Sequence, residues 1–229
     1  MTPTSERISI IIPTKNEAGG IQEIIGGVKP HVDEVLVVDG HSTDGTADLA
    51  LRAGARVIQQ SGRGKGNALR AGIAEAKGDI IVCMDADGSH DPASIPLLVE
   101  PIRRHEADLV IASRHRGGSD EWRGDLDNFL RSVGCGVVTV AMNYRWNVRI
   151  TDVLNGFRAI RRSVALTLDL KATDFDIEQH MVARCLRKGY RVMEVPSHES
   201  LRRWGHSKLP TYRKAYLFFG RLFLDMIGW

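Results

Sequence analysis

The sequence predicts an α/β fold with a mostly parallel central sheet and helices on both faces. Short runs of β-branched and apolar residues, each too short to be a helix, alternate along the chain with helical patterns. These runs contain few polar residues, as expected of strands that are buried on both faces. The first helical pattern places Ile21, Ile24, Ile25 and Val28 on one face. Such a sheet binds its ligands beyond the carboxyl ends of its strands, so the strand ends are where functional residues are expected.

The predicted elements follow in a regular order. Strands are expected at residues 8–12, 34–38, 56–58, 79–84, 108–112, 156–160 and 191–195. Helices are expected at residues 21–28, around Leu69 and Ile73, and at 95–102, 129–142 and 176–188. The alternation weakens after about residue 115, where a polar loop at 117–127 leads into the long helix. Residues 1–209 are predicted to form one large domain, and residues 210–229 a C-terminal amphipathic helix.

The composition excludes several classes of protein. A net charge of +3 over 229 residues is too low for a nucleic-acid-binding protein, although it is compatible with anionic ligands. Cys83, Cys135 and Cys185 lie far apart without disulfide or metal-ligand spacing, which is typical of a reducing compartment. No secretory signal pattern and no run of about 20 apolar residues is visible. We therefore expect a cytoplasmic protein that does not cross a membrane by itself.

Two aspartates follow the fourth predicted strand. Asp85 and Asp87 stand two residues apart, so their carboxylates can converge on one hard divalent cation. Such a cation keeps positions open for water and for substrate phosphate, which makes a metal–diphosphate site the functional hypothesis. The alternative is that both aspartates only form the turn before residues 89–92.

The first two strand ends carry polar residues whose role the pattern leaves open. Asp39 ends the second strand, where its carboxylate can accept hydrogen bonds from a nucleobase or simply form a turn. Residues 13–17 follow the first strand, with Asn16 placed as a helix N-cap and Glu17 in the first turn. These residues either contact a nucleoside or belong to the scaffold.

A glycine-rich segment at residues 62–66 precedes the helix around Leu69. Backbone N–H groups and the cations Arg63 and Lys65 gather there at a helix N-terminus, which is a natural anion site. Asn67 breaks the dinucleotide-binding pattern, and Gly66 breaks the P-loop pattern. Both departures argue against a dehydrogenase and a P-loop nucleotidase.

The end of the chain combines cations with a helical apolar pattern. Basic residues between 202 and 214 are followed by aromatic and aliphatic residues from Tyr216 to Trp229. A helix of this kind lies in a bilayer interface, or it packs on its own domain or on a partner subunit. The sequence favours neither alternative.

Taken together, these segments resemble the family 2 glycosyltransferases, in the branch of dolichyl- and polyprenyl-phosphate mannose and glucose synthases. The matching segments are residues 11–17, 37–39, 42–46, 64–68, 84–87, 113–114, 151–152, 155–158, 194–196 and 202–209. The resemblance implies a GT-A fold, which is Rossmann-like, inversion at the anomeric carbon, and Mg²⁺ or Mn²⁺ held by Asp85 and Asp87. Gly40 replaces a commonly seen second aspartate, and Ser89 stands where some relatives have glutamine. The third metal ligand and the base identity therefore stay open.

The resemblance also implies roles for individual residues. The nucleotide sugar is assigned to Pro13, Thr14, Asn16, Glu17, Asp39, Lys65, Asp85, Ala86, Asp87 and Arg114. The catalytic set is Asp87, Arg114, Arg202 and Lys208, of which the three cations face the phosphates. The acceptor is assigned to Arg131, Ser132, Asn155 and Arg158.

The implied reaction moves a hexose from GDP-mannose, UDP-glucose or another nucleotide sugar to a polyprenyl or dolichyl phosphate. The protein would then lie at the cytoplasmic face of a membrane, on its surface or beside a membrane subunit. A phosphate acceptor is already anionic near pH 7 and needs no strong base. A hydroxyl acceptor would need a carboxylate, with Asp174 or Glu178 as candidates. The alternatives are a transferase with a soluble acceptor and a non-catalytic nucleotide-sugar-binding homologue.

Overall fold

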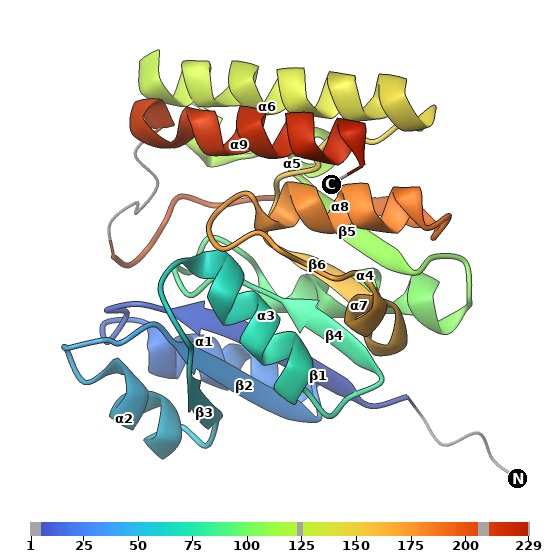
Figure 1. Ribbon diagram of the computed structural model, residues 1–229. Coiled ribbons are helices and arrows are strands. Elements are labelled where there is room, and N and C mark those ends of the chain that lie inside the picture. The colour runs from blue at the N-terminus through green and yellow to red at the C-terminus, as the bar shows by residue number, and fades with distance from the viewer. Residues whose placement is uncertain (1–5, 123–125, 206–210, 229) are drawn as a thin grey trace, which may run out of the picture.

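The computed structural model describes residues 6–122, 126–205 and 211–228, with side chains at 6–121, 132–205 and 216–228. In this part of the chain seven strands form one sheet in the order β3-β2-β1-β4-β6-β5-β7 (Figure 1). The strands are β1 (Ile8–Thr14), β2 (Glu34–Asp39), β3 (Arg56–Gln59), β4 (Ile80–Cys83), β5 (Leu109–Ser113), β6 (Arg158–Arg161) and β7 (Val192–Pro196). All seven predicted strands are confirmed, and with them the α/β fold.

The helices fill the connections between the strands. They are α1 (Ile21–Val28), α2 (Thr46–Arg52), α3 (Lys65–Glu75), α4 (Ile95–Arg103), α5 (Arg114–Gly117), α6 (Leu126–Trp146), α7 (Arg162–Thr167), α8 (Ile177–Arg187) and α9 (Thr211–Ile227). Among the described residues, no helix combines the length and the apolar character needed to span a bilayer. The division into a domain at 1–209 and a separate helix at 210–229 stays a prediction.

Strand β6 gives the sheet its one mixed region among the described strands. It runs antiparallel to both β4 and β5, whereas the other described pairs are parallel. Because β6 lies between them, it brings the loop before Arg158 next to the carboxyl ends of β4 and β5. Segments far apart in the sequence therefore meet at this edge.

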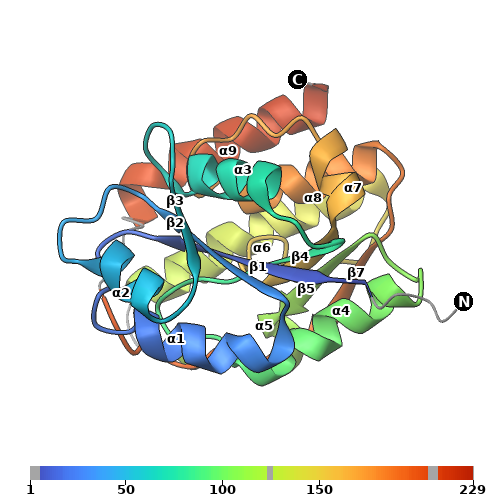
Figure 2. The same ribbon diagram turned by 90° about the horizontal axis from the view of Figure 1, so that it is seen from below.

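The strict alternation of side chains along β1 explains the two cores. Ile10 and Ile12 pack on one face with α1 and α4, and Ile11 packs on the other with α3 and α8. Figure 2 shows α1 and α4 on one side of the sheet and α3, α7 and α8 on the other. Helix α3 approaches the sheet closely at Gly72, where a Cβ atom would lie 2.6 Å from the Ile11 side chain.

Helices α6 and α9 form a further layer on the α8 side (Figure 1). Gln179 Nε2 on α8 donates to the Phe218 carbonyl oxygen of α9 at 3.2 Å. His180 Nδ1 lies 2.7 Å from Asp225 Oδ1, and both side chains are buried. The C-terminal helix is thus anchored on the domain by polar contacts as well as by apolar packing.

Candidate active site

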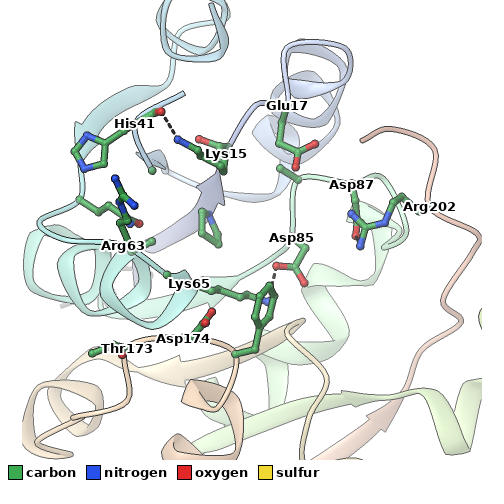
Figure 3. A pocket seen from close by; sticks show the side chains of 18 residues that line it. Lys15, Glu17, His41, Arg63, Lys65, Asp85, Asp87, Thr173, Asp174 and Arg202 are labelled. Atoms are coloured by element: carbon green, nitrogen blue, oxygen red, sulfur yellow. Dashed lines mark hydrogen bonds and ion pairs between the residues drawn. The ribbon is translucent and has the colours of Figure 1, made fainter. Parts of the chain in front are cut away.

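A cavity of about 820 Å³ lies at the carboxyl ends of β1, β2 and β4. Its size is in the range of small-molecule and cofactor sites. Of the residues predicted for the site, Pro13, Thr14, Glu17, Lys65, Asp85, Ala86, Asp87 and Arg202 line it. Figure 3 shows Asp85, Lys65 and Arg202 around one opening, with Glu17 and Lys15 from the first strand's exit. The structure therefore brings together the main carboxylates and cations that the sequence singles out.

Lys65 forms the floor of the cavity by bridging two carboxylates. Its Nζ lies 2.6 Å from Asp85 Oδ1 and 2.7 Å from Glu178 Oε1. Burial alone would lower the pKa of Lys65, but the charges of Asp85 and Glu178 outweigh it and raise the pKa above the ordinary value. Burial likewise acts to raise the pKa of Asp85, and the Lys65 charge outweighs it, so this carboxyl stays ionised. Lys65 and Asp85 are thus a fixed pair of charges at neutral pH.

The Asp87 carboxylate is fully engaged within the protein. Its Oδ1 accepts hydrogen bonds from the Ser89 backbone N–H at 3.0 Å and the Ser89 hydroxyl at 2.7 Å. Its Oδ2 lies 2.9 Å from Arg202 Nη2. Ser89 therefore orients the Asp87 carboxylate.

The chemistry of Asp85 and Asp87 fits a hard divalent cation. Both line the same cavity and offer oxygen ligands, which Mg²⁺ and Mn²⁺ prefer. Among the described residues, no group of three or more His, Cys, Asp or Glu side chains is placed to hold a metal. A cation bound here would complete its coordination with water and ligand phosphate, as is usual for Mg²⁺.

The loop after β1 is joined to the loop after β2 by side-chain hydrogen bonds. Asn16 Oδ1 accepts from the Thr43 backbone N–H, and the Asn16 backbone N–H donates to Ser42 Oγ, both at 2.9 Å. Asn16 is not the N-cap of α1, as the sequence predicted, because α1 begins only at Ile21 with Gly20 as its cap. Asn16 has a left-handed conformation with φ of 54°, which asparagine tolerates better than most residues.

The Asp39 carboxylate stabilises the loop after β2 by a hydrogen bond. Its side chain is buried and accepts from the Ser42 backbone N–H at 3.0 Å. It does not line the cavity, so its contact with a nucleobase stays a prediction. The adjacent Gly40 does line it, and a Cβ atom there would lie 3.0 Å from the Thr14 carbonyl oxygen. An aspartate has little room at this position, which gives a physical reason for the glycine.

The glycines at 62–66 are used for close packing against the loop at 172–174. A Cβ atom on Gly64 would lie 2.3 Å from the Thr173 carbonyl oxygen, and one on Gly66 would lie 2.5 Å from that of Ala172. The Asn67 backbone N–H donates to the Thr173 carbonyl oxygen at 3.2 Å. The predicted anion site is therefore a wall of the cavity to which Arg63 and Lys65 contribute the cations.

Arg114 lies outside the cavity lining, in an ion pair with Asp152. Its Nε lies 2.7 Å from Asp152 Oδ2 and its Nη2 lies 2.9 Å from Asp152 Oδ1, and Glu199 is 3.6 Å away. Burial opposes the charged form of Arg114, but Asp152 outweighs it and raises the pKa of the guanidinium. This bidentate pair already occupies the Arg114 guanidinium. The assignment of Arg114 to the phosphates stays a prediction.

The four residues predicted for the acceptor do not line the cavity as a group. Asn155 and Arg158 are buried, and their side chains hydrogen-bond to backbone groups, including the Ala112 and Glu178 carbonyl oxygens. These two residues therefore brace the backbone beneath the site, and their contact with an acceptor stays a prediction. Ser132 is half-buried on α6. The Arg131 side chain and all of Lys208 lie outside the described residues, so their roles stay predictions.

Several lining residues were not assigned from the sequence. They are His41, Gln60, Thr173 and Phe175, whereas Lys15 and Arg63 were named only within wider segments and Asp174 only as a base candidate. Gln60 directly follows β3, so the rule that directs attention to strand ends would have found it. Thr173 and Phe175 reach the cavity only through the packing of the glycine-rich segment, for which no local sequence signal exists. Glu178, the other base candidate, is buried beneath Lys65 and does not line the cavity.

Comparison with known proteins identifies the family. Residues 9–168, more than half of the chain, match glycosyl transferase family 2. The chain is 34% identical over 219 residues to an undecaprenyl-phosphate mannosyltransferase of Micrococcus luteus, covering 89% of this chain and 87% of that protein. It is 32% identical over 197 residues to glycosyltransferase AglJ of Haloferax volcanii, covering 85% of this chain but only 63% of that protein.

A solved structure supports the same fold. Glucosyl-3-phosphoglycerate synthase of Mycobacterium tuberculosis, in complex with Mn²⁺, UDP and glucosyl-3-phosphoglycerate, superimposes with a TM-score of 0.78. The alignment covers 98% of this chain and 81% of that one, at 24% identity, so it bears on the fold alone. The fold is of the GT-A type, and the chain belongs to glycosyl transferase family 2.

Proposed function

We propose that this protein transfers a hexose from a nucleotide-diphosphate sugar to a polyprenyl or dolichyl phosphate, with inversion. The observation that carries the proposal is the cavity at the strand ends, where Asp85, Asp87, Lys65 and Arg202 lie together. The Micrococcus luteus relative is named an undecaprenyl-phosphate mannosyltransferase, which supports a hexose as the transferred group and a polyprenyl phosphate as the acceptor.

The charges of the cavity suit a departing nucleoside diphosphate. Breaking the bond between sugar and phosphate leaves negative charge on the diphosphate, and preorganised cations stabilise that charge as it develops. Arg63 and Arg202 line the cavity and could take this role, Arg202 by leaving its ion pair with Asp87. A divalent cation held by Asp85 and Asp87 would supply further charge neutralisation at the same diphosphate.

A phosphate acceptor agrees with the position of the carboxylates. Glu178 is buried and paired with Lys65, so it is poorly placed to take a proton from a hydroxyl acceptor. A lipid phosphate carries its nucleophilic charge already and needs positioning more than deprotonation. Asp174 lines the cavity and is the remaining carboxylate for a hydroxyl acceptor.

The layer of α6 and α9 supports a peripheral membrane location. On α9, Tyr216, Phe219, Phe223 and Ile227 recur at helical spacing and are 47–70% exposed. On α6, which lies beside α9 (Figure 1), Val133, Val137, Val140 and Tyr144 form a second exposed apolar stripe. Exposed apolar surface of this extent is typical of a protein or membrane interaction site. We propose that these helices contact the bilayer that holds the lipid acceptor.

Transfer assays test the reaction. GDP-mannose and UDP-glucose are supplied with Mg²⁺ or Mn²⁺ and with either polyprenyl phosphate or a soluble sugar as acceptor. We expect transfer to polyprenyl phosphate from one donor, with activity lost in Asp87→Asn and retained in Asp91→Asn, an exposed aspartate that only caps a turn. Transfer to the soluble sugar alone would refute the lipid acceptor, and the absence of any transfer would favour a non-catalytic binding protein.

Vesicle sedimentation tests the membrane contact separately. We expect Phe219→Ser with Phe223→Ser to reduce binding to vesicles that contain anionic lipid, because both side chains are exposed on α9. Leu97→Ser is the matched control, since Leu97 is equally exposed but lies on α4, on the opposite side of the sheet. Equal losses in the two proteins would contradict a specific membrane face.

A further inference from the structure

Both carboxylate oxygens of Asp87 already have partners within the protein. Ser89 supplies two hydrogen bonds to Oδ1, and the Arg202 guanidinium lies against Oδ2 at 2.9 Å. The Asp87 residue is only 6% exposed, so water contributes little to its stabilisation. Arg202 therefore supplies the positive charge that an ionised, nearly buried carboxylate requires.

The segment that carries Arg202 is fixed over the metal-ligand loop. In this strap, residues 199–205, the backbone N–H groups of Arg203 and Trp204 donate to the Asp87 carbonyl oxygen at 2.9 and 3.2 Å. The Trp204 ring packs against Gly88 so closely that a Cβ atom there would lie 2.4 Å from it. The backbone of the strap is thus held in place independently of the Arg202 side chain.

The Arg202 side chain has a freedom that Lys65 lacks. Lys65 is held by a second carboxylate, Glu178, and its side chain is 13% exposed. The Arg202 side chain is 27% exposed and lines the cavity, so it can change rotamer and reach a ligand without movement of the strap backbone. A guanidinium is also well suited to bind a diphosphate, because its donors match phosphate oxygens in pairs.

We propose that Arg202 is a resident counter-ion of Asp87 that competes with the divalent cation. The guanidinium 2.9 Å from Asp87 Oδ2 would repel a cation that approaches this oxygen, so the site without nucleotide should bind metal weakly. A nucleoside diphosphate offers Arg202 a new partner and thereby opens Asp87 to the metal. Metal and nucleotide consequently strengthen each other's binding, by the same factor in both directions.

The competition rests only on the contacts of Arg202, whereas the coupling to nucleotide rests also on the proposed function. The test therefore begins without nucleotide or transfer. Free Mn²⁺ is measured by its electron paramagnetic resonance signal while wild type, Arg202→Gln and Arg202→Met are titrated. The matched control is Arg203→Gln, the neighbour on the strap whose guanidinium pairs with exposed Glu23.

Removing the guanidinium charge should tighten Mn²⁺ binding by roughly fivefold, the factor expected from breaking one partly exposed ion pair. Arg203→Gln should bind Mn²⁺ as the wild type does. Adding GDP or UDP should then raise the Mn²⁺ affinity of the wild type more than that of either Arg202 variant. Arg202→Lys, which keeps the charge, should behave like the wild type in the absence of nucleotide.

Unchanged or weaker Mn²⁺ binding in both charge-free variants would overturn the competition, as would a failure of every protein to bind Mn²⁺. Tighter binding in the variants together with an equal nucleotide effect in all proteins would overturn the coupling. Failure of sugar transfer to polyprenyl phosphate would sink the proposed function without affecting the Mn²⁺ titration. The two claims can therefore fail separately.

Discussion

Lys65 is the side chain whose removal should disturb the site most. It is 13% exposed, and its Nζ lies within 2.7 Å of both Asp85 and Glu178. Lys65→Met keeps the length of the side chain but leaves two carboxylates without their shared cation. Removing one partner of a buried ion pair costs about 3–5 kcal/mol, because the remaining charge is poorly solvated.

The two carboxylates should contribute unequally to this loss. The Asp85 side chain is 30% exposed and opens to the cavity, so water can replace much of the lost interaction. The Glu178 side chain is 4% exposed and cannot be solvated in place. We therefore expect Lys65→Met to lower the free energy of unfolding by about 3 kcal/mol, at the lower end of that range.

Urea unfolding of a double-mutant cycle measures this prediction. Glu178→Gln in the Lys65→Met background removes the stranded charge and should restore most of the lost stability, so the two substitutions should be strongly non-additive. Arg63→Met serves as the control, because Arg63 lies in the same loop and lines the same cavity. A loss below about 1 kcal/mol in Lys65→Met, or simple additivity, would refute the bridging role.

Three further predictions concern Asp152, Gly156 and Asp87. Burial acts to raise the pKa of Asp152, but the Arg114 charge outweighs it, so the pKa lies below its ordinary value. The stability that this ion pair contributes is therefore fully present above about pH 4, and it is lost as the pH falls through the lower pKa of the folded state. Asp152→Asn should flatten this acid loss in urea unfolding, and an unchanged slope would contradict the pairing. Gly156→Ala places a Cβ atom 2.8 Å from Asp85 Oδ2 and Lys65 Nζ, and should lower turnover by roughly tenfold to a hundredfold. Gly26→Ala meets nothing within 4 Å and should leave turnover unchanged, and equal effects of the two would contradict the steric argument. Chelation should abolish transfer, fresh Mn²⁺ should restore it in the wild type but not in Asp87→Asn, and transfer that survives the chelator would contradict metal dependence.

The strands could be predicted because each buried strand is a short run of mostly apolar residues. In residues 8–12 every position except Ser9 is apolar, and the structure buries the isoleucines of both faces in two separate cores. The antiparallel direction of β6 could not be predicted, since a strand of four residues carries the same pattern in either direction. The cavity nevertheless lies at the strand ends, where the sequence analysis expected the site, and Asp85 and Asp87 line it.

The partners of the charged residues were beyond the reach of the sequence. Arg114 pairs with Asp152, 38 residues away, and the Arg158 guanidinium donates its hydrogen bonds to backbone carbonyl oxygens. No local pattern distinguishes such an arginine from one that faces a ligand. Asn16 misled for a related reason, because asparagine serves equally well as a helix cap and in a left-handed turn.

The binding of nucleoside diphosphates tests most directly whether the cavity works through a divalent cation. Calorimetric titration of GDP and UDP into the wild type and Asp87→Asn, each with Mn²⁺ and with chelator, isolates the contribution of the metal. We expect at least one nucleotide to bind the wild type tightly with Mn²⁺ and to lose at least tenfold in affinity with chelator or in Asp87→Asn. Equal affinity under all four conditions would contradict a metal–diphosphate site at these aspartates.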